Sequence, residues 1–147
     1  MKKYNQKIVD NNIGDCFRAC MATLLQLPPE VLPNDFSPAW HRNWQNYLEQ
    51  FGLSLSYSNR SDQPIWLWQP WIASVPSLNY KNTTHAILMH QSGVVLHDPS
   101  TKKKYKTGRR LNSNIVQSGQ HLIVNDSTKL HLLEAYRKQL NPKGKSE

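Results

Sequence analysis

The segment 84–98 constrains the fold of this chain more than any other part of it. Its two halves, THAILMH and VVLHD, are rich in β-forming residues and flank the turn signal QSG at 91–93. Two such runs around a Ser-Gly pair favour an antiparallel hairpin. We therefore predict paired strands over 84–90 and 94–98, and with them a fold that contains an antiparallel sheet.

Helix-forming residues dominate the segment 15–27, and its apolar positions recur at helical spacing. Asp15 is the predicted N-cap of this helix, while Pro28 and Pro29 stop it. Cys16 therefore falls in the first helical turn.

The remaining elements follow from the same two periodicities. The patterns predict a second helix over 39–51 and two further strands, over 53–57 and 121–124. A final amphipathic helix is predicted after a cap at 125–127. The aromatic run 65–72 is interrupted by a proline and is not assigned to an element.

The length of the chain limits it to one domain. A chain of 147 residues, 38% of them hydrophobic, is long enough to bury one sizeable core and too short for two. We expect a single α+β domain over 1–141, in which the helix that carries Cys16 packs on the antiparallel sheet. The residues 142–147 are expected to form a flexible tail.

The N-terminal residues and the uncharged stretches indicate neither export nor a membrane span. The segment 1–12 has lysines but lacks the apolar run of a secretory signal. The longest uncharged stretch, 63–80, contains three prolines, so it cannot form the roughly 20-residue apolar helix that crosses a bilayer. Two cysteines without an export signal favour reduced thiols. We therefore expect a cytoplasmic protein.

Cys16 is the candidate nucleophile. In the first turn of a helix it faces unpaired backbone N–H groups and the positive end of the helix dipole, which favour thiolate over thiol. The same helix start can offer an N–H group to a developing oxyanion. A buried structural cysteine is the alternative interpretation. Cys20, one helical turn further on, is expected to be a small core residue.

The predicted hairpin brings a candidate base and its orienting group together. If its loop has two residues, paired positions sum to 185, so His85 faces Ser100 and lies diagonally to Asp98 on the same side of the sheet. A four-residue loop keeps this parity, and a three-residue loop breaks it. The same parity places His90 and His97 on the other face of the sheet. Asp98 would then fix the tautomer of His85.

Taken singly, a strand histidine is often a satisfied core residue, and an aspartate before proline often ends a strand. The order Cys, His, Asp nevertheless suits a nucleophile, a base and an orienting residue. GDCFRACMATLLQLPPEVLPNDF, the tryptophan-bearing helix after it and THAILMHQSGVVLHDPS resemble the small papain-like peptidase homologues of bacteria and their phages, related to the bacteriocin-processing cysteine peptidases. The resemblance implies a papain-like α+β fold, with Cys16 as nucleophile, His85 as base and Asp98 as orienting residue.

One position departs from that family. Its members often place a glutamine six residues before the cysteine to complete the oxyanion hole, and here this position is Asp10. Asn11 or Asn12 is expected to substitute as the donor.

A zinc site is the alternative use of the cysteines. Cys16, Cys20 and two histidines have enough ligand atoms for a tetrahedral site. Neither the cysteine spacing nor the histidine spacing matches the usual short-loop zinc motifs. We therefore expect no metal and no cofactor.

The excess positive charge of the chain is local. Eighteen lysines and arginines against ten acidic residues give a net charge of +8. Six of the cations lie in one short basic segment, at Lys102, Lys103, Lys104, Lys106, Arg109 and Arg110. Such a run attracts phosphates or acidic proteins, or it is only a solvated turn.

The sequence thus favours a cysteine hydrolase, a peptidase or isopeptidase, that acts on a protein or peptide substrate, acidic ones included. The alternative is a catalytically inactive binding or decoy protein of the same fold, with the basic segment and Trp66, Trp68 and Trp71 as its partner surface. Interleaved aromatics and cations suit single-stranded nucleic acid. Because the two groups lie about thirty residues apart, nucleic acid is not expected to be the main partner, and no membrane partner is expected.

Overall fold

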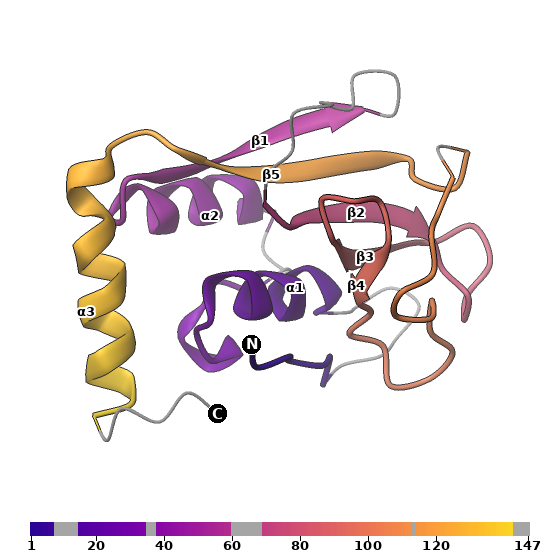
Figure 1. Ribbon diagram of the computed structural model, residues 1–147, viewed down its shortest axis with the longest axis horizontal. Helices are drawn as coiled ribbons and strands as arrows, with labels where there is room; N and C mark the ends of the chain where they lie inside the picture. The colour runs from indigo at the N-terminus through magenta and orange to yellow at the C-terminus, as the bar shows by residue number, and fades with distance from the viewer. Residues whose placement is uncertain (8–14, 35–37, 60–68, 113, 143–147) are drawn as a thin grey trace.

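The computed structural model describes residues 1–7, 15–34, 38–59, 69–112 and 114–142. Its elements in chain order are α1 (Cys16–Leu25), the 3-10 helix η1 (Pro29–Val31), α2 (Trp40–Glu49), β1 (Leu53–Asn59), β2 (Trp71–Pro76), β3 (Thr84–Met89), β4 (Val95–His97), β5 (Ser118–Val124), the 3-10 helix η3 (Ser127–Lys129) and α3 (Leu130–Leu140). The strands form one five-stranded sheet in the order β1-β5-β2-β3-β4 (Figure 1). Every neighbouring pair is antiparallel. The predicted α+β class and antiparallel sheet are confirmed.

Strand β2 is the strand that the sequence patterns did not predict. The aromatic run 65–72 overlaps only its first two residues, and prolines stand at 70 and 76. A proline near an apolar run argues against a central strand because it cannot donate to the ladder. Here Pro76 occupies the last position of the strand, opposite Thr84. The strand therefore lies between β5 and β3 without a proline in its interior.

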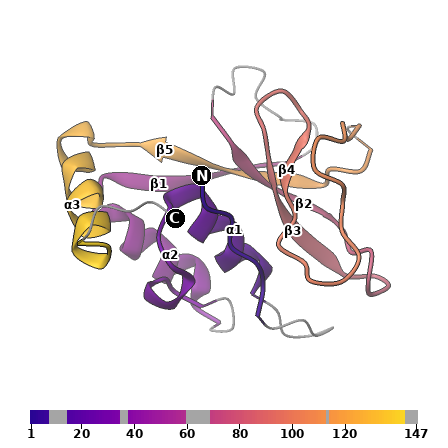
Figure 2. The ribbon, with the colours of Figure 1, turned by 60° about the horizontal axis from the view of Figure 1, so that its bottom comes forward.

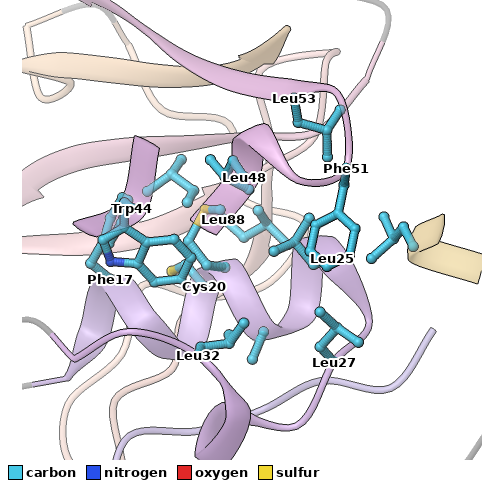
Figure 3. Packing of buried hydrophobic residues seen from close by; sticks show 14 residues of the cluster. Phe17, Cys20, Leu25, Leu27, Leu32, Trp44, Leu48, Phe51, Leu53 and Leu88 are labelled. Carbon is cyan, nitrogen blue, oxygen red and sulfur yellow. The ribbon is translucent and has the colours of Figure 1, made fainter. Parts of the chain in front are cut away.

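Helices α1 and α2 lie on the same face of the sheet, as both ribbon views show (Figures 1 and 2). The core between these helices and the sheet includes Phe17, Cys20, Trp44 and Leu88 (Figure 3). Full burial of a large apolar side chain contributes about 1.5–3 kcal/mol. Cys20 is 0% exposed in this core, which agrees with the prediction of a small core residue.

A second core covers the opposite face of the sheet. It contains the residues of β2 and β3 that alternate with those of the first core, among them Trp71 and Ile87, and it is covered by Tyr105 from the segment after β4. Trp71 is only 5% exposed, so the idea that it belongs to a partner surface is wrong. Trp66 and Trp68 lie outside the described residues.

The hairpin of β3 and β4 reaches its predicted register by an unexpected route. The N–H of His90 donates to the carbonyl of Val94 at 2.9 Å, so the loop has three residues, 91–93, a length that on its own breaks the predicted parity. A β-bulge then follows in the ladder and inserts one extra residue into β4. Beyond the bulge Leu88 pairs with His97, which is the predicted register.

Gly52 lies in the turn between α2 and β1. Its φ is +73°, and its carbonyl accepts the N–H groups of Asn125 at 2.8 Å and Asp126 at 3.1 Å. A side chain at this position would overlap the carbonyl of Asp126. The Asp126 carboxylate in turn accepts the N–H of Thr128, so the predicted cap at 125–127 is confirmed at the start of η3.

Candidate active site

Cys16 is the first residue of α1, as predicted, and Asp15 is its N-cap. The Asp15 carboxylate makes no capping hydrogen bond to the helix. Instead it accepts the N–H of Lys7 at 3.2 Å. The first-turn N–H groups around Cys16 are therefore not taken by the cap carboxylate, and the positive helix end acts on the sulfur.

His85 and Asp98 meet at one end of the sheet. His85 is the second residue of β3, and Asp98 follows the last residue of β4. The Nε2 atom of His85 lies 2.6 Å from Oδ1 of Asp98. The Cys16 side chain acts on the same imidazole and raises the pKa of His85. Since Nε2 is engaged by Asp98, the ring nitrogen that remains for the sulfur is Nδ1.

The carboxylate of Asp98 is held by two backbone donors besides His85. The N–H of Ser100 donates to Oδ1 at 2.9 Å, and the N–H of Tyr105 donates to Oδ2 at 2.8 Å. Burial would raise the pKa of Asp98, but the hydrogen bond and charge of His85 and the two N–H donors hold this pKa below its ordinary value. Asp98 is therefore a buried carboxylate that stays charged.

His85 is consequently held as an imidazolium. Burial lowers the pKa of His85, yet the hydrogen bonds to Asp98 and Cys16, together with the charges of both groups, outweigh burial and raise the pKa to about 9. The charged ring thus persists through neutral pH and is lost only as the pH rises through that value. A thiolate beside an imidazolium is the ion pair that cysteine nucleophiles use.

Asn79 holds the loop that carries the two backbone donors. Its Oδ1 accepts the N–H of Lys103 at 3.1 Å, and its Nδ2 donates to the carbonyl of Lys103 at 3.1 Å. The same Nδ2 lies 3.4 Å from the Ser100 hydroxyl. Asn79 therefore ties the turn between β2 and β3 to the loop 100–105, and it is a positioning residue for Asp98.

Asn79→Ala should loosen this loop and weaken both N–H contacts to Asp98. Loss of hydrogen bonds worth about 1 kcal/mol lowers the pKa of His85 by somewhat less than one unit. We expect the His85 ring to titrate at correspondingly lower pH, while the alkylation of Cys16 by iodoacetamide at pH 6 stays at the wild-type rate because the ring is still charged there. Asn112→Ala, which removes a side-chain contact to the N–H of Asn114 in the same segment, is the matched control and should change neither. An unchanged His85 titration in Asn79→Ala would show that Asn79 has no positioning role.

The other histidines have different partners. His97 donates from Nε2 to the carbonyl of Tyr4 at 2.7 Å, and His90 contacts the hydroxyl of Ser92 at 2.8 Å through Nδ1. His121 contacts Ser58 at 3.0 Å. In the described part of the chain no three histidines, cysteines or acids are placed to hold a metal ion.

Gln6 is a residue of this site that the sequence patterns did not single out. Its N–H donates to the carbonyl of Pro99 at 2.8 Å, while the next residue, Lys7, donates to Asp15. Gln6 is only 8% exposed. It therefore lies between the segment that supplies the orienting carboxylate and the helix start that supplies the sulfur.

Gln6 was not predicted because its distance from Cys16 in the sequence differs from the spacing expected for the oxyanion-hole glutamine. The expected glutamine stands six residues before the cysteine, whereas Gln6 stands ten residues before Cys16 and is the only glutamine upstream of it. A search by residue type, with the length of the intervening segment left open, would have found it. The expected donors Asn11 and Asn12 lie outside the described residues.

Comparison with known proteins assigns no family to this chain. Neither a protein-family model, nor a curated protein, nor a solved structure matches it. None of the helices in the described ranges combines the length and the apolar character that crossing a membrane requires. The chemistry of the site must therefore carry the functional argument.

Proposed function

We propose that this protein is a cysteine hydrolase in which Cys16 is the nucleophile, His85 the base and Asp98 the orienting residue. The observation that carries the proposal is the grouping of three side chains: the imidazole of His85 lies 2.6 Å from a buried, charged Asp98, and the Cys16 side chain acts on the same ring. A structural role does not need a charged histidine between a thiol and a carboxylate. Nucleophilic catalysis does.

The proposed reaction breaks an amide, thioester or isopeptide bond in a protein or peptide. The Cys16 thiolate attacks the acyl carbon, and the carbonyl electrons move to oxygen. As the oxyanion collapses, the bond to the leaving group breaks and the His85 imidazolium donates its proton to that group. Water, deprotonated by the now neutral His85, then hydrolyses the acyl-cysteine and restores the pair.

Fold and chemistry together support a papain-like relationship as part of this proposal. A cysteine at a helix start, a histidine near the start of a strand and an acidic residue after the next strand are the arrangement implied by the motifs around these residues. A reducing cytoplasm is the proposed location, because the reaction needs Cys16 as a free thiol and both cysteines are free.

Gln6 is our proposed oxyanion donor beside the α1 backbone. The residue is buried and its backbone is bonded to the segment that carries Asp98, and a side-chain amide N–H is a suitable donor to negative charge on oxygen. Removing one oxyanion donor costs about 10²–10³ in rate. The proposal gives the site the group that Asp10 does not provide.

Gln6→Ala should separate acylation from thiol reactivity. With p-nitrophenyl acetate, which passes through an oxyanion, acetylation of Cys16 should slow by about 100-fold. Alkylation by iodoacetamide forms no oxyanion and should change by less than about twofold. Mass spectrometry of Cys16 follows both reactions, and Cys16→Ala is the blank for the acetylation. If Asn11→Ala or Asn12→Ala slows acetylation and Gln6→Ala does not, the donor is an asparagine and the assignment of Gln6 is wrong.

An inactive binding or decoy protein is the competing function. The exposed basic segment favours it, but the loss of Trp71 to the core removes part of its proposed surface. Formation and turnover of an acetyl-cysteine at Cys16 decide between the two functions. A protein that reacts with neither the ester nor iodoacetamide faster than an ordinary thiol would be a binding protein.

A further inference from the structure

The part of the chain that holds the triad carboxylate is almost free of acidic residues. Between Asp62 and Asp126 the only acidic residue is Asp98, and its charge is already paired with His85. The same stretch carries seven exposed cations, namely Lys81, Lys102, Lys103, Lys104, Lys106, Arg109 and Arg110. No other acidic residue between Asp62 and Asp126 is therefore available to balance the charge of these seven cations.

The basic segment is fastened directly to the catalytic residues. Its neighbours Ser100 and Tyr105 donate their N–H groups to Asp98, and the backbone of Lys103 is held by Asn79. The loop after β4 runs beside the start of α1, where Cys16 lies, in both ribbon views (Figures 1 and 2). The backbone of this loop thus faces the site while its lysine side chains are exposed to solvent.

Lys3, from the N-terminal segment, and Lys104, from the basic segment, affect the same histidine. Burial lowers the pKa of His97 and the hydrogen bond to Tyr4 opposes it, while the positive charges of Lys3 and Lys104 lower it further. Lys3 belongs to the N-terminal segment that continues to Gln6. Lys3 and Lys104 therefore both act on the ring of His97, the residue that precedes Asp98.

We propose that this basic surface selects acidic protein segments as substrates and draws them across Cys16. The proposal rests on the proposed hydrolase function, and it assigns the substrate class. Complementary charge raises the local concentration and the association rate of an anionic partner. Asp98 cannot oppose such a partner, because its negative charge is buried and paired.

A protein partner fits this surface better than a nucleic acid. Single-stranded nucleic acids are held by exposed aromatic rings on which bases stack. Trp71 is buried, and the ring of Tyr80 is covered by Lys102, whose Nζ lies 5.4 Å from the ring centroid and 3.2 Å from the hydroxyl. An acyl bond for Cys16 to attack is present in a protein and absent from a nucleic acid backbone.

The charge of the site is measured with two small reagents on the full chain. The rate ratio of iodoacetate, an anion, to iodoacetamide, its neutral counterpart, reports the potential at Cys16. The Lys103→Gln/Lys104→Gln variant should lower this ratio by about threefold in low salt, and about 0.5 M salt should remove the difference. Lys129→Gln/Lys138→Gln removes equal charge from η3 and α3 and should leave the ratio as in the wild type. Equal ratios in all three proteins would overturn the proposal.

The partner class is measured with labelled probes. A glutamate-rich peptide should bind in fluorescence anisotropy, weaken at least about fivefold in the Lys103→Gln/Lys104→Gln variant, and slow iodoacetamide alkylation of Cys16. A glutamine-rich peptide of equal length is the neutral control. Tighter binding of an oligothymidylate of equal charge, or peptide binding that leaves Cys16 unprotected, would overturn the proposal. Fluorescence anisotropy measures peptide binding to the basic surface even if Cys16 proves unreactive. Failure of the hydrolase proposal is therefore distinguished from failure of the substrate-class proposal.

Discussion

In the His85→Ala variant, alkylation of Cys16 by iodoacetamide at pH 6 falls by about 10- to 100-fold. At this pH an ordinary thiol with a pKa of about 8.5 is well under 1% ionised, so fast alkylation requires the imidazolium partner. The lower figure takes into account that a stabilised thiolate is intrinsically a weaker nucleophile. This weaker nucleophilicity offsets about half of the rate gain from ionisation on a logarithmic scale. Site-resolved mass spectrometry measures the rate at Cys16.

Two controls come from the chain itself. His90→Ala removes a partly exposed histidine of the same hairpin whose ring contacts the loop residue Ser92, and it should leave the rate at Cys16 unchanged. Cys20, 0% exposed, serves as the slow internal reference in every sample. If His85→Ala and His90→Ala alkylate at the same rate, the pair between Cys16 and His85 does not form in solution.

Asp98→Asn should remove the positive charge of the His85 ring at neutral pH. Without the carboxylate, burial is no longer outweighed, so the pKa of His85 falls from about 9 toward or below the ordinary 6.5. Because this pKa falls, the ring loses its positive charge at a lower pH than in the wild type. The ring is an imidazolium at pH 7–8 in the wild type and neutral there in the variant. Titration of the His85 ring by NMR measures both values.

The same substitution should cost about 10²–10⁴ in acetylation of Cys16 by the activated ester, because the histidine loses its orientation and its charge. The amide that replaces the carboxylate would also turn its own NH₂ group toward an N–H donor of Ser100 or Tyr105, which destabilises the fold by about 1–3 kcal/mol. Thermal unfolding therefore accompanies the assay. A folded variant that retains the titration and acetylation of the wild type would remove Asp98 from the site.

Local patterns predicted most of the architecture. The helix that begins at Cys16, the strands of the hairpin and the partner strands β1 and β5 follow from periodicity and caps, which depend on neighbouring residues. Strand β2 does not, because prolines at 70 and 76 obscure its pattern and its place depends on β3 and β5. Long-range pairing is what a local pattern lacks.

The pairing of His85 with Asp98 was predicted from strand parity under a two-residue or four-residue loop. The loop has three residues, and a β-bulge supplies the missing residue, so the prediction holds for a reason that the pattern did not contain. Gln6 and Asn79 were not predicted. Both make contacts that are remote in sequence, from Gln6 to Pro99 and from Asn79 to Lys103.

The central claim, a preformed thiolate–imidazolium pair at Cys16, is tested most directly by the pH dependence of its alkylation in the wild-type protein. Iodoacetamide labelling is followed at Cys16 from pH 5 to pH 9, with Cys20 as the reference in the same sample. The account predicts a rate that is already high at pH 6 and nearly constant up to the titration of His85 at about 9. A rate that rises about tenfold per pH unit across this range, as for an ordinary thiol below its pKa, would contradict the account.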